Sequence, residues 1–122
     1  MADDITRRIE EILSKIDMSH VTFSQLRCIR SFGSVSRARA RIWSFPTVWQ
    51  LALGLKPHYV IEVIAEHFDH LPFEEQTKIL IHELLHIPRT FSGALRPHRM
   101  RHFHLGREMA KFYNQYKKND DQ

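Results

Sequence analysis

The sequence predicts an α+β protein in which helices pack on a small, mostly antiparallel sheet of three or four strands. Three stretches predict it: isoleucines at helical spacing near the N-terminus, a β-branched run over residues 59–64, and an apolar helical run after Pro72. We expect the first helix and the helix after Pro72 to pack on the sheet, and a C-terminal helix to close the structure. The 122 residues suffice for a single domain, 1–122, with one modest core.

The first predicted helix spans residues 5–17. Ile5, Ile9, Ile12 and Ile16 recur at the helical period, and charged side chains fill the opposite face. We interpret this segment as a structural helix that packs across the sheet.

Two strands are predicted before residue 45. Leu26–Phe32 carries a mixed apolar pattern, Gly33 opens a turn, and residues 37–44 alternate between basic and small or apolar side chains. The period of two indicates a strand with arginines on one face, and the turn predicts a hairpin-like pair of the two strands.

The arginine face is the strongest candidate contact for a polyanion such as nucleic acid. Arg37, Arg39 and Arg41 form it, inside a stretch with no acidic residue between Asp17 and Glu62. An exposed strand face with charged side chains, which also guards a sheet edge against aggregation, explains the pattern equally well. Nucleic acid is therefore a candidate partner that charge alone does not establish.

The next segment is ambiguous until residue 59. Pro46 and Gly54 favour either a short helix or a turn between them. We expect Trp43 and Trp49 to lie in the core or in a cleft wall rather than to stack on bases. The run 59–64 that follows predicts a strand.

The helix after Pro72 carries the most informative motif of the chain. It is predicted from Phe73 to about Ile87, where Pro88 stops it, and it contains H-E-x-x-H at residues 82–86. Positions four apart share a helix face, so His82 and His86 present two neutral nitrogens to one zinc ion. Glu83 lies beside them and is placed to activate a water molecule.

The significance of this motif depends on its chance frequency and on its surroundings in the sequence. With 9 histidines in the chain, the five-residue pattern carries a chance of coincidence. The strand before the motif and the proline after it supply the context that such a site requires. Imidazole ligands favour zinc over magnesium or calcium.

A catalytic zinc takes a third protein ligand. We predict His98 first and His102 second, because a final helix predicted from about His98 would return them to the motif. The less favoured alternatives are Glu62, Glu66, Asp69, His104 and Glu108.

The final helix is amphipathic. It would bury Leu105, Met109, Phe112 and either Tyr113 or Tyr116. The polar tail at about 117–122 is predicted to be flexible.

Four segments carry a resemblance to a known family: Tyr59–Ile64, Ile81–Pro88, Phe91–Gly93 and Leu95–His98. Together they resemble the metallopeptidases of archaea and phages, small relatives of the SprT-like zincins, over roughly residues 26–104. The resemblance implies a minimal zincin-like fold and zinc as cofactor. By the match, His82, His86 and His98 are the zinc ligands and Glu83 the catalytic base. Phage members often carry Asp after the third histidine, where this chain has Arg99.

The function predicted from these residues is a zinc-dependent metallopeptidase acting on a peptide or protein substrate. A donor to the developing oxyanion is expected from Arg89, Arg96 or Tyr113. By analogy with the SprT-like proteins, the peptidase would act near nucleic acid. The alternative is a nucleic-acid-binding module with a structural or vestigial zinc site; a metal-free regulatory protein is a third possibility.

Composition sets the remaining expectations. Cys28 is the single cysteine, so it forms no internal disulfide, and we expect it to be a buried apolar residue. No apolar run approaches the roughly 18 residues of a membrane span, and no apolar signal segment follows Met1. We therefore expect a cytoplasmic protein with no membrane partner. The sequence leaves the oligomeric state open.

Overall fold

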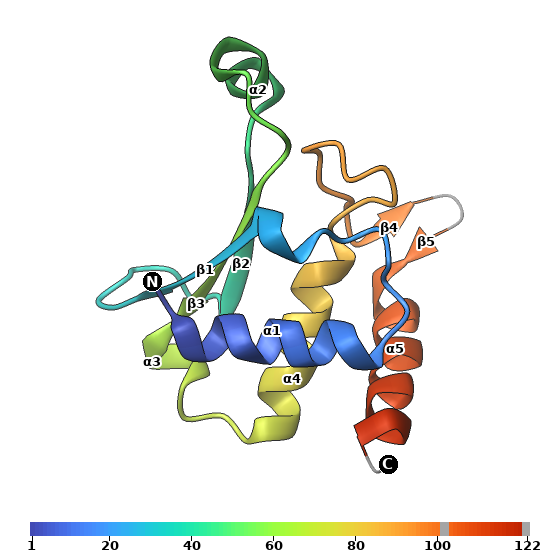
Figure 1. Ribbon diagram of the computed structural model, residues 1–122. Coiled ribbons are helices and arrows are strands. Elements are labelled where there is room, and N and C mark those ends of the chain that lie inside the picture. Colours follow the sequence, from blue (N-terminus) through green and yellow to red (C-terminus); the bar gives the residue numbers. More distant parts are fainter. Residues whose placement is uncertain (101–102, 121–122) are drawn as a thin grey trace.

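A computed structural model describes residues 1–100 and 103–120, and its α+β class confirms the prediction (Figure 1). The helices are α1 (Asp3–Lys15), α2 (Thr47–Leu53), α3 (Ala65–Phe68), α4 (Phe73–Leu85) and α5 (Leu105–Asp120), with a 3₁₀ turn, η1 (Phe23–Gln25). The strands are β1 (Leu26–Ser31), β2 (Ala40–Ser44), β3 (Tyr59–Ile64), β4 (Arg99–Met100) and β5 (Phe103–His104).

The main sheet has the order β1-β3-β2, which corrects the predicted pairing. β3 pairs in parallel with β1 and antiparallel with β2, so the first two strands do not form a hairpin and the sheet is mixed. The reason lies in burial: Tyr59, Ile61, Val63 and Ile64 of β3 are fully buried, and the most apolar strand takes the centre. Alternation of side chains with a period of two predicts a strand, but it does not predict which other strand pairs with it.

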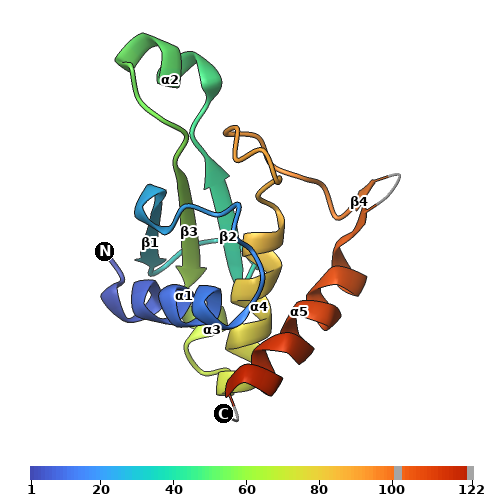
Figure 2. The same ribbon diagram turned by 45° about the vertical axis from the view of Figure 1, so that its right-hand side comes forward.

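Helices α1 and α4 pack on one face of this sheet, and α5 packs against both helices (Figures 1 and 2). The predicted isoleucine stripe of α1 is buried there, together with Leu80 and Leu84 of α4. Cys28 is also buried, as predicted, and burial raises the pKa of its thiol. The core thus holds α4, and with it residues 82–85, against the sheet.

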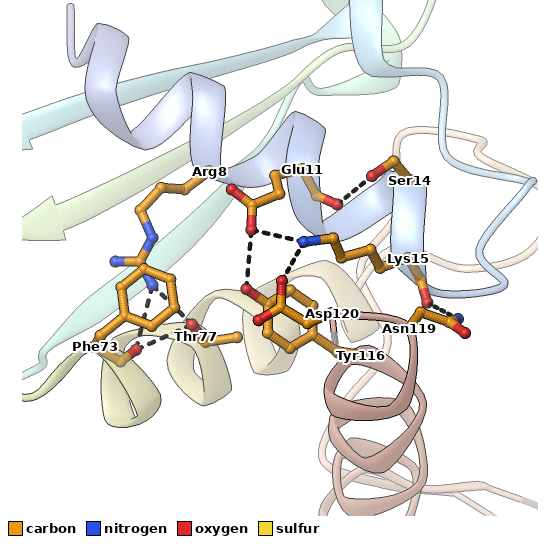
Figure 3. A network of polar contacts seen from close by, with 9 residues as sticks. All are labelled: Arg8, Glu11, Ser14, Lys15, Phe73, Thr77, Tyr116, Asn119 and Asp120. Carbon is orange, nitrogen blue, oxygen red and sulfur yellow. Dashed lines mark hydrogen bonds and ion pairs between the residues drawn. The ribbon is translucent and has the colours of Figure 1, made fainter. Parts of the chain in front are cut away.

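Polar contacts tie α1 to the start of α4 (Figure 3). The guanidinium of Arg8 lies 4.1 Å from the centroid of the Phe73 ring. It also donates to Thr77 Oγ1 at 2.7 Å and to the Phe73 carbonyl at 3.2 Å. These bonds fix the first two turns of α4.

A second set of polar contacts ties α1 to the end of α5 (Figure 3). Lys15 pairs with Glu11 at 3.1 Å and also with Asp120. Asn119 donates to the Lys15 carbonyl at 2.7 Å, and Tyr116 donates to Glu11 at 3.1 Å. The final helix therefore continues to Asp120, through most of the segment 117–122 that we assigned to the tail; residues 121 and 122 lie outside the described range.

The beginning of the final helix is also corrected. It begins at Leu105 instead of about His98, because the β4–β5 ladder intervenes. The Leu105 N–H donates to the His98 carbonyl at 2.8 Å and closes that ladder. His98 consequently lies in the loop before β4.

Residues 45–58 form an arm that projects from the sheet between β2 and β3 (Figures 1 and 2). Of the two alternatives left open for Pro46–Gly54, the short helix is the one formed, and it ends at Gly54, whose φ is +64°. Trp49 of this helix is exposed, as is Trp43 of β2, so neither lies in the core, the first of the two places expected for them. Among the described residues, no helix is both long and apolar enough to cross a membrane.

Candidate metal centre

Three histidines meet beside the C-terminal end of α4. His82 belongs to the last turn of α4, His86 caps that helix, and His98 comes from the loop that precedes β4. One ring nitrogen from each lies within 4.8 Å of the other two. The Nε2 atoms of His82 and His98 are 3.1 Å apart. Two nitrogens bound to one tetrahedral zinc ion stand about 3.3 Å apart, so the donor set fits that metal.

The orientation of His86 is fixed by its other ring nitrogen. Nδ1 bonds to the backbone carbonyl of Arg96. A carbonyl only accepts, so Nδ1 carries the hydrogen and Nε2 keeps the lone pair that a metal requires.

Burial keeps the two helix histidines neutral. It lowers the pKa of His82 to about 4, with smaller contributions from His86 and His98. Burial is also the main cause that lowers the pKa of His86. Only a neutral imidazole offers a ligand lone pair, so these shifts suit metal binding.

The segment 89–98, which we call the site loop, delivers His98 and is anchored at several points. The Arg96 N–H donates to the His86 carbonyl at 2.6 Å, and its Nε donates to the Leu85 carbonyl at 3.1 Å. Tyr59 of β3 accepts from the Gly93 N–H at 2.9 Å and donates to the Ala94 carbonyl at 2.8 Å. The loop is therefore bound both to α4 and to the base of the arm.

Gly93 is required at its place in the site loop. Its φ is +96°, and a Cβ there would approach the Phe45 carbonyl oxygen to 3.2 Å and overlap the Gln50 side chain. The loop can pass this close to the arm only because residue 93 lacks a side chain.

Glu83 is buried and follows His82 directly in the last turn of α4. Burial raises the pKa of its carboxyl to about 7. With His82 it opens onto a cavity of about 320 Å³. The other residues lining that cavity are Arg39, Ala40, Glu75, Lys78, Ile79 and Met109.

Residues 1–118 match the family described as "Putative phage metallopeptidase". The chain belongs to this family. The match extends beyond residues 26–104, on which the sequence resemblance rested; the relation to SprT-like zincins and to archaeal proteins stays a prediction. Neither the curated proteins nor the solved structures provide a match to the chain. The family name suggests a peptidase and implies a metal, which the three histidines are able to hold.

Two charged residues beside the candidate site were not among those predicted from the sequence. Lys78 and Glu75 line the cavity beside Glu83, and they form an ion pair at 3.5 Å. They lie four and seven residues before His82, which is the spacing of one helix face. That periodicity could have placed both of them beside the motif.

The side chains predicted as oxyanion donors do not line the cavity on which His82 and Glu83 open. Arg89 and Arg96 line a different cavity of about 510 Å³, whose lining includes none of the three histidines. The guanidinium of Arg96 lies 3.9 Å from the centroid of the Phe103 ring. The Tyr113 hydroxyl donates to Glu74 in the first turn of α4, at the opposite end of that helix from the motif.

The other candidate ligands are engaged elsewhere. Glu62 bonds to Arg41, Trp43 and Ser31, Glu66 accepts from the Gly33 N–H, and Asp69 pairs with Arg30. His104 accepts from the Arg107 N–H at 3.2 Å, and Glu108 lines the larger cavity. His102 lies outside the described residues.

The three arginines predicted on one strand face are separated by the fold. β2 begins only at Ala40, so Arg37 and Arg39 precede it, and both are exposed. Arg39 lines the cavity beside Glu83. Arg41 Nε donates to Glu62 Oε1 at 2.7 Å, so its charge is already paired. Of the three arginines, only Arg41 therefore belongs to β2, and the polyanion contact stays a prediction.

Proposed function

We propose that this family member is a zinc-dependent peptidase that hydrolyses peptide bonds by activating a water molecule with Glu83. One observation carries the proposal: three histidine nitrogens lie within 4.8 Å of one another, and the buried Glu83 opens onto the same cavity as His82. A purely structural metal site has no need for that carboxylate.

The roles follow from the geometry. His82, His86 and His98 would hold the ion. A zinc ion bound there would supply Lewis-acid polarisation of a water molecule and of the substrate carbonyl. Glu83 would take a proton from that water and pass it to the leaving amine. Because burial raises its pKa, Glu83 is a stronger base than an exposed glutamate.

The free edge of β2 is the expected place for the substrate. Within the described residues β2 pairs only with β3, so its other edge offers unpaired backbone groups. Ala40 of β2 and the preceding Arg39 line the cavity with Glu83. An extended peptide added to this edge would run past the carboxylate.

Lys78 and Arg39 replace the donors predicted from the sequence. Both line the cavity on which Glu83 opens, whereas Arg89, Arg96 and Tyr113 do not. A cation in that place would stabilise negative charge as it develops on the substrate carbonyl.

No observation favours the alternative, a nucleic-acid-binding module with a vestigial zinc, because Arg41 is paired with Glu62 and Arg39 belongs to the site cavity. A SprT-like role near nucleic acid remains a proposal. Cleavage assays with and without added DNA would test it, and stimulation by DNA is the result that role requires.

The deciding experiment compares metal content and cleavage of an unfolded protein substrate in wild type and Glu83→Gln. We expect both proteins to bind one zinc ion and the variant to lose roughly 10²–10⁴-fold in kcat. Glu10→Gln, an exposed change on α1, is the matched control and keeps wild-type cleavage. Failure of the wild type to bind zinc would refute the proposal, and full activity of Glu83→Gln would refute the role of Glu83.

A further inference from the structure

The tip of the arm exposes an unusual amount of apolar surface. Five large apolar side chains occur within eight residues, and each is between 47% and 80% exposed. They are Val48, Trp49, Leu51, Leu53 and Leu55. No residue of α2 is buried. The core therefore gains nothing from these side chains, and their apolar character needs another explanation.

These side chains form one broad face of α2. Successive residues of a helix are rotated by about 100° around its axis. Measured from Val48, Trp49 lies at about 100°, Leu53 at about 140° and Leu51 at about 300°. A helix that lies in a membrane interface turns a wide apolar face toward the acyl chains and keeps a polar face in water. The apolar side chains of α2 cover an arc of about 200°, and Thr47 and Gln50 occupy the remaining side, which is the pattern of such an interfacial helix.

The position and charge of the arm agree with this conclusion. The arm carries α2 away from α1, α4 and α5, so its tip can leave water while the rest of the protein does not (Figures 1 and 2). Lys56 is the one Lys, Arg, Asp or Glu within residues 45–58. No acid occurs between Asp17 and Glu62, so the arm itself contributes no side chain that would repel an anionic surface.

We propose that the arm is a membrane-docking element that inserts α2 into the interface of an anionic phospholipid bilayer. The aliphatic side chains enter the acyl boundary, Trp49 takes the interfacial position that its ring favours, and Lys56 meets lipid phosphate. The absence of a membrane span led us to expect no membrane partner. Peripheral docking requires no span, so the two observations agree.

Two other occupants fit less well. In a second copy of the chain, a facing α2 covers only part of the apolar arc and leaves the rest in water. Nucleic-acid bases stack on aromatic rings, whereas four of the five exposed side chains are aliphatic. The proposal does not depend on peptidase activity.

Co-sedimentation of the full chain with vesicles tests the proposal. The vesicles contain phosphatidylcholine with about one quarter phosphatidylglycerol, and pure phosphatidylcholine provides the neutral comparison. We expect binding to the anionic vesicles, weakened by salt, with a blue shift of tryptophan emission that Trp49→Phe removes. Leu51→Glu/Leu53→Glu should weaken binding at least roughly tenfold, because charge replaces two inserted side chains.

Val35→Glu is the control, since it places one such charge on a fully exposed apolar residue outside the arm. It should bind vesicles like wild type, and unchanged thermal unfolding would show that each variant is folded. Absence of wild-type binding would overturn the proposal, as would an equal loss in Val35→Glu. A wild-type dimer that the arm variant converts to monomer, with no vesicle binding by either, would assign the arm to a second copy instead.

Discussion

The Nδ1 of His86 bonds to the backbone carbonyl of Arg96, ten residues later in the chain. This contact joins the H-E-x-x-H motif to the loop that supplies the third histidine. Such partners of metal-binding histidines fix both the ring orientation and the tautomer, and their loss typically costs 10–100-fold in metal affinity. The site therefore depends on the path of the site loop as much as on the motif.

Gly93→Ala should lower zinc affinity by roughly 10–100-fold, although residue 93 contacts no histidine of the site. A methyl group at a φ of +96° is strained and overlaps Gln50, so the loop must shift together with Arg96 and His98. Competition with a zinc chelator would measure the change. Gly106→Ala, which has room for a Cβ within α5, is the control and should bind zinc normally.

His98→Ala should abolish stoichiometric zinc binding while leaving the fold intact, because His98 is exposed and contributes little to the core. Metal analysis of the purified protein and circular dichroism would measure the two properties. His104→Ala removes a nearby exposed histidine and should retain zinc. Equal zinc content in both variants would rule out His98 as the third ligand.

Lys78→Ala should reduce cleavage by roughly tenfold or more without changing zinc content, since the ammonium group lies in the cavity beside Glu83. Steady-state kinetics would separate an effect on kcat from one on KM. Lys118→Ala, an exposed change near the end of α5, should leave both constants unchanged. Wild-type kinetics in Lys78→Ala would mean that Lys78 does not contact the reacting groups.

Because of Glu62, the free energy of unfolding should decrease at acidic pH. Its hydrogen bond from Arg41, with further bonds from Ser31 and Trp43, lowers the pKa of the Glu62 carboxyl from an ordinary 4.5 to about 2. The folded state therefore binds the proton more weakly than the unfolded chain. The stabilisation is complete above about pH 4.5 and is lost as pH falls toward about 2.

Thermal unfolding of the zinc-free protein between about pH 6 and pH 2 would measure this dependence; removing zinc excludes the acid sensitivity of the histidine ligands. Glu62→Gln should cost about 2 kcal/mol at neutral pH, since charged hydrogen bonds are lost, and should flatten the acid dependence. Glu10→Gln should keep the wild-type profile. A Glu62→Gln protein with the same acid dependence as wild type would exclude Glu62 as its source.

The sequence predicted what depends on local periodicity. The isoleucine spacing, the β-branched run and the H-E-x-x-H spacing each describe one element, and α1, β3 and α4 form close to the predicted places. The order of the strands depends on which of them is apolar enough to be buried at the centre of the sheet. That comparison involves all the strands, so the pattern of one strand does not predict it. The hairpin expected from Gly33 was therefore wrong, and β3 separates its two strands.

The same distinction applies to the candidate site. His82 and His86 lie together because of helical geometry, and Lys78 could have been added by the same rule. The roles considered for Arg89, Arg96 and Tyr113 depended on tertiary packing, which directs their side chains elsewhere. The Trp43 indole donates to Glu62 at 2.8 Å, a pairing that only the sheet register creates.

The Tyr59 hydroxyl has a consequence for communication within the molecule. It lies at the base of the arm and holds Gly93 and Ala94 of the loop that carries His98. The base of the arm is thus joined by one phenol to the loop that carries His98. If docking of the arm changes the affinity for zinc by some factor, then binding of zinc must change the affinity of docking by the same factor. Zinc-loaded and zinc-free protein, compared on the same vesicles, would report the strength of that coupling.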